Sequence, residues 1–259
     1  MNDAVDHDRL PPGIGGLIDL GLAAWAQRAP LYLALSAGVF AVCAALEALW
    51  PARTESALVI KELVLIYSEL FGLAFVIAAS ALGVATRVAG ESVSARTLMA
   101  GALERWPAVL GAVLVVSLVA MLTSPYAALG RLPDPPVLAL LTAPPIWLLW
   151  GVVSLAGPIA ALSGDRPLIA LLASFPRAIA LSLRRGNLVR VCVLGFVTIV
   201  PTLIASILFD VLGKRGASHV TFWANLPIDA ITVAPVSAIQ TAFALDFARR
   251  AGAVDDPPR

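Results

Sequence analysis

Side chains that commonly carry out chemistry are scarce in this chain. Its 259 residues include two cysteines, two histidines and only 14% charged residues. Cys43 and Cys192 fall within apolar stretches, where a thiol packs as a small apolar group, and His7 and His219 are isolated in the sequence. Because no ligand spacing for a metal is present, we expect neither a metal site nor a cofactor.

An excess of basic charge is also missing. Eighteen basic residues are offset by seventeen acidic ones, and no basic cluster is interleaved with aromatic residues, so no nucleic-acid partner is expected. The first ten residues contain Asp3, Asp6 and Asp8, which is the reverse of the basic start of a signal peptide. We therefore expect the first apolar segment to remain in the mature protein.

Hydrophobic residues are abundant, at 59% of the chain. They form six stretches close to the roughly 20 residues that cross a bilayer as a helix. These stretches cover residues 31–50, 63–86, 106–130, 137–162, 191–209 and 226–245. The last one is short, so it either spans the membrane or is re-entrant. The pattern predicts an all-α integral membrane protein with six transmembrane helices.

The basic residues lie mostly on one side of these six segments. Thirteen of the eighteen fall in the N-terminal region, the second and fourth connections and the C-terminal tail. Lysine and arginine are enriched in cytoplasmic loops. We therefore predict that both termini face the cytoplasm, in a bacterial cytoplasmic (inner) membrane.

Three stretches with helical periodicity, 14–28, 93–106 and 167–187, precede the first, third and fifth segments. In the last of them, apolar residues recur at helical spacing beside several arginines: Leu168, Leu172, Phe175, Ile179 and Leu183. This composition is typical of an amphipathic helix lying in the membrane interface. We predict three such helices on the cytoplasmic side.

These interfacial stretches end alike and at similar spacing, in Arg28-Ala-Pro30, Arg105-Trp-Pro107 and Arg185-Gly-Asn187. One interpretation is a threefold repeat of an interfacial helix followed by two spans, covering 14–88, 92–164 and 166–250 of a single membrane domain. The other is that alternating basic loops merely imitate a period. Residues 1–12 and 251–259 are expected to be disordered tails.

Three motifs carry a resemblance: Leu103-Glu-Arg-Trp-Pro107, Gly157-Pro158 followed by residues 167–187, and Ala244-Leu-Asp-Phe-Ala-Arg-Arg250. On these motifs the chain resembles the membrane domain of bacterial glycerophosphoryl diester phosphodiesterases and related six-span bacterial inner-membrane proteins. It departs from the family in its longer stretch 175–187, and in Phe247, which follows Asp246 where an aromatic usually precedes the acid. The resemblance implies no enzyme activity, because the family's soluble esterase domain has no room beside six spans.

Glu69 lies inside the second apolar segment, where a carboxylate usually faces a cavity or a partner. Glu62 shares its helical face, and Lys61 is adjacent. These residues either line a polar entrance on the outer side, or Glu69 simply reaches the interface and pairs with Lys61. In the sixth segment, Gln240 is a candidate for a hydrogen bond between helices.

The candidate contacts to lipid headgroups are Arg105, Arg177, Arg184, Arg185 and Arg190. They serve either lipid recognition or plain anchoring. We therefore expect a non-catalytic inner-membrane protein in lipid interaction or membrane organisation, with membrane lipids, anionic ones among the candidates, as its partners. The alternatives are a transporter or channel component for a small solute or cation using Glu69 and kinked helices, and an accessory subunit that anchors an enzyme. A membrane-protein partner or a homo-oligomer also remains open.

Overall fold

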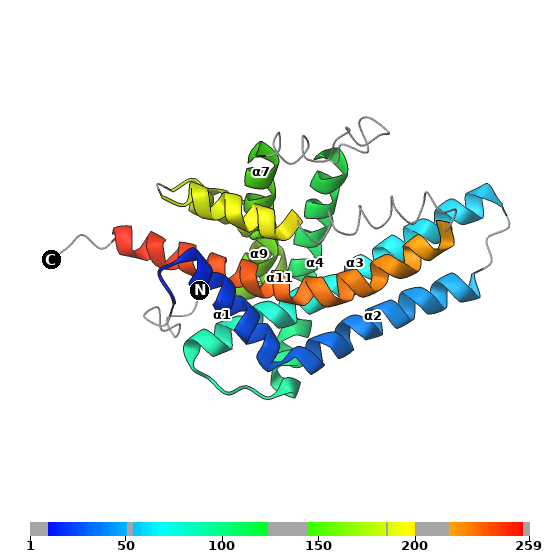
Figure 1. Ribbon diagram of the computed structural model, residues 1–259, viewed down its shortest axis with the longest axis horizontal. Coiled ribbons are helices and arrows are strands. Elements are labelled where there is room, and N and C mark those ends of the chain that lie inside the picture. The colour runs from blue at the N-terminus through cyan, green and yellow to red at the C-terminus, as the bar shows by residue number, and fades with distance from the viewer. Residues whose placement is uncertain (1–9, 51–53, 124–143, 185, 200–217, 256–259) are drawn as a thin grey trace.

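The computed structural model describes residues 10–50, 54–123, 144–184, 186–199 and 218–255 (Figure 1). Within these residues every regular element is a helix. The labelled helices are α1 (Ile14–Gln27), α2 (Ala29–Leu49), α3 (Glu55–Ala89), α4 (Ala95–Thr123), α7 (Pro144–Ser154), α8 (Ala156–Leu162), α9 (Pro167–Ser182) and α11 (Ser218–Asp255). A further apolar helix covers Leu188–Ile199. The prediction of an all-helical protein is confirmed for the described residues.

Four helices are long and apolar enough to cross a membrane. Their candidate spans are Ala29–Leu46, Glu55–Ala89, Ala95–Leu118 and Ile231–Gly252, which correspond to the first, second, third and sixth predicted segments. The fourth and fifth segments contain the shorter apolar helices Trp147–Leu162 and Leu188–Ile199. Their remaining parts, 137–143 and 200–209, lie outside the described residues. Four spans are therefore supported, and the prediction of six stays a prediction.

The ends of α3 show why this apolar stretch begins and stops where it does. The Thr54 side chain accepts a hydrogen bond from the amide of Ala57 at 3.2 Å, which caps the first turn. At the other end, Gly90 adopts a left-handed conformation with φ of 73°, and its amide bonds to the carbonyl of Arg87. Between these caps, 35 residues form one helix.

The prediction of a separate interfacial helix at residues 93–106 is wrong. Helix α4 continues through Pro107, so this stretch is the first part of a longer helix. An internal proline removes one backbone hydrogen bond, but neighbouring helices often support such a kink in a membrane. Near the similar motif Arg28-Ala-Pro30, in contrast, Arg28 leaves the helical conformation and Pro30 lies in the first turn of α2, where proline is tolerated.

Helix α11 is the central element of the described fold. Its candidate span is 67% buried, against 18% for that of α2. Figure 1 shows α11 running beside α3, with α1 packed along its lower side in this view. The approaches are close: the Ser80 hydroxyl donates to the carbonyl of Ala234 at 2.9 Å, and a Cβ on Gly21 would lie 2.7 Å from the Ile239 Cα. Small residues therefore let α1 and α3 pack directly on α11.

Candidate functional site

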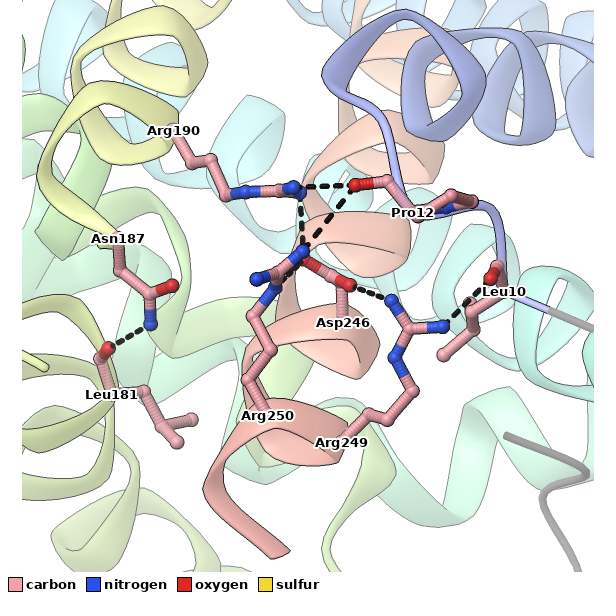
Figure 2. Close-up of polar contacts among 8 residues, drawn as sticks. All are labelled: Leu10, Pro12, Leu181, Asn187, Arg190, Asp246, Arg249 and Arg250. Atoms are coloured by element: carbon pink, nitrogen blue, oxygen red, sulfur yellow. Dashed lines mark hydrogen bonds and ion pairs between the residues drawn. The ribbon is translucent and has the colours of Figure 1, made fainter. Parts of the chain in front are cut away.

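Asp246 on α11 is fully buried and stands three residues after Phe243 and one before Phe247, both of which are also fully buried. Burying a carboxylate is costly unless cations and hydrogen bonds compensate it. Here three arginines do so. Arg190 Nη1 and Arg250 Nε each donate to Asp246 Oδ2 at 2.8 Å, and Arg249 donates to Oδ1 (Figure 2). We call Asp246, Arg190, Arg249 and Arg250 the Asp246 cluster.

Two helices bring the Asp246 cluster together. Arg249 and Arg250 lie three and four residues after Asp246, so they share its face of α11. Arg190 comes from the start of the helix Leu188–Ile199. The chain turns into that helix at Gly186, with φ of 87°, and the Asn187 side chain bonds back to the Leu181 carbonyl at 2.8 Å. This turn after α9 directs Arg190 toward α11.

The cluster also holds the segment that leads into α1. Arg249 donates to the carbonyl of Leu10 at 2.7 Å, and Arg190 donates to that of Pro12 at 2.5 Å. Arg250 shares the Pro12 carbonyl at 3.3 Å. Figure 2 shows the three guanidinium groups converging between this segment and α11. Residues near both ends of the chain thus meet at one site.

Arg190 and Arg250 lie close to each other because they share both acceptors. Two like charges about 4 Å apart repel by about 4 kcal/mol at an effective dielectric constant of 20, and Asp246 offsets this repulsion. The pKa of Arg190 is lowered, mainly because burial disfavours its charged form. Asp246 opposes this effect, whereas Arg250 and Arg249 add to it. Since arginine stays protonated in proteins, the four side chains of the cluster sum to a net charge of +2.

Helix α9 presents three different faces. Small residues are buried against the bundle, and large apolar residues are exposed. The buried set is Ala170, Ser174, Ala178 and Ser182, and the exposed set is Leu168, Leu172, Ile179 and Leu183. At 3.6 residues per turn, Arg177 lies about 180° from Leu168 and belongs to neither set. Its side chain is about half exposed.

A weak ion pair accompanies the basic face of α9. Arg177 Nη1 lies 3.5 Å from Asp165 Oδ2, and both side chains are well exposed. The Ser163 hydroxyl donates to the same carboxylate at 2.7 Å and is the main cause that lowers the pKa of Asp165, with Arg177 contributing less. Because exposed pairs contribute little to stability, Arg177 remains available to a charged surface.

A pocket of about 210 Å³ lies between α4 and the loop that leads into α9. Its lining includes Arg105 and Arg166 together with Glu104 and Asp165. Because the charges of these four side chains balance, the pocket favours neither cations nor anions.

Three arginines make comparable contacts to backbone carbonyls. Arg28 Nη2 donates to Val93 at 2.9 Å, and Arg184 Nη1 donates to Ala251 at 2.9 Å. Arg105 Nη1 donates to Ser163. Each arginine lies at or next to the end of a predicted interfacial stretch and bonds to the chain near the boundary that closes its predicted unit. Val93 and Ala251 lie just beyond units 14–88 and 166–250, and Ser163 lies just inside unit 92–164. We call these three contacts the arginine latches.

The structure gives the predicted headgroup arginines different surroundings. Arg105 and Arg184 take part in the arginine latches, Arg190 belongs to the Asp246 cluster, and Arg177 lies at the surface of α9. Arg185 lies outside the described residues. Sequence reasoning missed Asp246 as a site residue, because it was considered only as the boundary of an apolar segment and as part of the motif that carries the resemblance. The available signal was an acid followed three and four residues later by arginines.

The predicted polar site on α3 is only partly described. Lys61 is buried and Glu69 is half-buried, while the side chain of Glu62 lies outside the described residues. Gln240 Nε2 donates to the Thr198 hydroxyl at 3.2 Å.

The structure does not bring Gln240 to Glu69. One turn before Gln240, the Ser237 hydroxyl contacts the carbonyl of Ile77 at 3.4 Å. Ile77 is eight residues beyond Glu69, or about 12 Å along α3. Gln240 therefore serves helix packing at a different level of the bundle.

Comparisons with known proteins found no counterpart: no family model, no curated protein and no solved structure matches the chain. Within the described residues, no three histidine, cysteine, aspartate or glutamate side chains are grouped as a metal ion would require. The candidate functional features of the described residues are therefore guanidinium groups that lie next to apolar surface.

Proposed function

We propose that this is a non-catalytic, multi-spanning inner-membrane protein whose helix α9 interacts with the anionic lipids of the cytoplasmic leaflet. The observation that carries the proposal is the division of α9 into a buried small-residue face, an exposed apolar face and a basic face. A helix on the surface of a soluble protein would expose polar residues instead of leucines. Exposed leucines on the side of the helix opposite Arg177 fit a helix at the boundary between acyl chains and headgroups.

The buried face fixes the orientation of α9 in this proposal. Ala170, Ser174 and Ala178 allow close packing against the bundle, so the helix cannot roll about its axis without losing these contacts. Leu168 and Leu172 then enter the acyl region while Arg177 reaches the headgroups. Each arginine near an anionic surface contributes about 1 kcal/mol. The resulting function is lipid interaction or membrane organisation, with the bundle as a rigid support.

Six spans, cytoplasmic termini and a threefold repeat belong to the same proposal, with the second unit beginning in the first part of α4 instead of a separate interfacial helix. The arginine latches support the repeat, because Arg28, Arg105 and Arg184 each bond to a carbonyl at a similar distance along the chain, 65, 58 and 67 residues further on. Arg28 and Arg105 end their predicted stretches, and Arg184 precedes by one residue the Arg185 that ends the third. All three latches then lie on the cytoplasmic side, where the basic residues are concentrated.

A second candidate function, transport of a small solute or cation, is favoured by the burial of Lys61 and partial burial of Glu69 within an apolar span. Ionisable side chains in such positions often mark a translocation path. The test is uptake into proteoliposomes. If Glu69→Gln abolishes uptake that the unaltered protein supports, transport replaces lipid interaction as the leading function, whereas absence of uptake by the unaltered protein removes this candidate.

Lipid composition tests the leading proposal. The protein is reconstituted into nanodiscs from equal amounts of phosphatidylcholine and phosphatidylglycerol, and the lipids of filled and empty discs are compared by mass spectrometry. We expect phosphatidylglycerol to be enriched around the protein, and the double variant Arg166→Gln with Arg177→Gln to reduce the enrichment. Identical composition in filled and empty discs would contradict the proposal.

A further inference from the structure

We propose that the Asp246 cluster is a binding site for a single phosphate monoester, presented either by a lipid headgroup or by a soluble molecule. The inference deepens the proposed function in its lipid form, since it names one bound headgroup in addition to a general attraction to the leaflet. It is carried by the convergence of Arg190 and Arg250 on the same two acceptors, Asp246 Oδ2 and the Pro12 carbonyl.

The paired guanidinium groups match the chemistry of phosphate. Guanidinium is planar and rigid, and its parallel N–H groups bind two oxygens of one phosphate at once. Arg190 and Arg250 both donate to one oxygen at 2.8 Å, so their donor nitrogens lie within twice that distance of each other. Groups this close can contact different oxygens of one phosphate. A carboxylate and a neutral carbonyl already hold them together before the anion arrives.

Charge favours a doubly negative ligand. Asp246 supplies one negative charge to both Arg190 and Arg250, and the Pro12 carbonyl supplies only a dipole. The C-terminal end of α11 adds a partial negative charge, equivalent to about half a unit. The whole cluster, with Arg249, sums to +2 before this reduction. A phosphate monoester carries about −1.5 to −2 near neutral pH, which matches the cluster better than the single charge of a phosphodiester.

Access comes from the side of Arg250. The exposed fractions are 36% for its side chain and 12% for that of Arg190, while Asp246 is fully buried. An incoming phosphate therefore meets Arg250 first and Arg190 behind it. Asp246 remains beneath the pair, where it keeps both guanidinium groups oriented.

The site differs from the basic face of α9. Arg177 stands at the surface with one partner at 3.5 Å, whereas Arg250 stands in a prearranged pair. Arg96→Gln removes the same charge as Arg250→Gln at an exposed position of α4 that belongs neither to α9 nor to the pair, so it is the matched control. Arg250→Lys keeps the charge and a possible ion pair with Asp246 but loses the planar fork. This second variant tests the site even where Arg250→Gln destabilises the protein.

The experiment uses the full chain in phosphatidylcholine nanodiscs containing a small fraction of phosphatidic acid or of phosphatidylglycerol. Native mass spectrometry counts the lipids retained on the released protein. We expect one phosphatidic acid to be retained in preference to phosphatidylglycerol. Arg250→Gln and Arg250→Lys should weaken this retention by about tenfold or more, and Arg96→Gln should leave it unchanged.

A second arm tests the soluble source of the same chemistry. Inorganic phosphate is added to protein in discs of pure phosphatidylcholine, and the unfolding temperature is followed. A rise that is smaller in Arg250→Lys assigns the site to a soluble phosphate, whereas retention of phosphatidic acid without this rise assigns it to the lipid.

Failure of this inference is distinct from failure of the proposed function. Equal losses in the Arg250 and Arg96 variants, or no selective binding in either arm, would overturn the phosphate site. Enrichment of phosphatidylglycerol in the discs would then still support α9 as the lipid-interacting element. Conversely, phosphatidic acid could be retained in an Arg250-dependent way without any enrichment of phosphatidylglycerol around the protein. That result would support the phosphate site and contradict the proposal that α9 interacts with anionic lipids in general.

Discussion

Helices α2 and α11 both contain a candidate membrane span, but the two spans have different surroundings. The span of α2 is mostly exposed to its surroundings, with Leu33 and Val42 pointing outward, whereas two thirds of the span of α11 is buried by other helices. A helix surrounded by lipid has to be apolar. A helix surrounded by protein can carry Gln240 and Asp246, because the neighbouring helix Leu188–Ile199 supplies Thr198 and Arg190, and α11 itself supplies Arg249 and Arg250.

The largest effect should come from removing the buried charge on α11. Asp246→Ala leaves three guanidinium groups without their common carboxylate, so we expect the free energy of unfolding to fall by about 3–5 kcal/mol. Reversible unfolding in bicelles measures this loss. The control is Asp19→Ala, on the exposed face of α1, which should change stability by less than about 0.5 kcal/mol. Equal losses of stability in the two variants would contradict the claim that the buried acid on α11 stabilises the protein more than the exposed acid on α1.

A matched pair of glycines tests packing on the two helices. Gly21 lies against α11, where an added Cβ meets the backbone of Ile239, while a Cβ on Gly38 of α2 meets no atom within 4 Å. Gly21→Ala should therefore destabilise the protein by about 1–3 kcal/mol. Gly38→Ala should be neutral or stabilising by up to about 1 kcal/mol, since alanine favours a helix. The same unfolding assay measures both, and a neutral Gly21→Ala would mean that α1 does not pack closely on α11.

The arginine latches allow a comparison among the three proposed units. Arg28→Gln and Arg184→Gln each remove a hydrogen bond of 2.9 Å to a carbonyl, so each should cost about 1–2 kcal/mol of stability. Similar losses, measured by unfolding in bicelles, would support equivalent units. A loss confined to Arg184→Gln would tie this contact to the central position of α11 and would remove the support for the repeat.

The smallest effect concerns the surface of α9 and depends on pH. The lowered pKa of Asp165 means that its charged form contributes stability above the unfolded pKa, and that this contribution is lost as pH falls through the folded pKa. Ser163→Ala removes the main cause, so the pKa should rise toward the ordinary value. Carboxyl NMR of selectively labelled protein reports the midpoint. An unchanged midpoint would show that the hydroxyl is not a significant partner.

The length of the apolar stretches was enough to predict four of the helices, because a run of about 20 apolar residues has few alternatives to a helix in a membrane. Periodicity also predicted the apolar face of α9. It did not reveal which face is buried, because the residues that pack there are small and carry little hydrophobic signal: Ala170, Ser174, Ala178 and Ser182.

Two features were beyond sequence reasoning for physical reasons. The continuity of α4 through Pro107 depends on whether neighbouring helices support a proline within the helix, which local propensity does not encode. The Asp246 cluster joins Pro12, Arg190 and Asp246, which are far apart in the sequence. No spacing rule connects such residues; only the packing of α1 and the helix Leu188–Ile199 on α11 brings them together.

The depth of α9 in the membrane tests the central claim most directly. In a protein whose two cysteines have been replaced, a fluorescent label is attached after Leu172→Cys or after Arg177→Cys, with Ser174→Cys as the buried control. The account predicts that nitroxides on lipid acyl chains quench the label at position 172, whereas a water-soluble quencher acts mainly at position 177. Equal quenching of both labels by the water-soluble agent would contradict it.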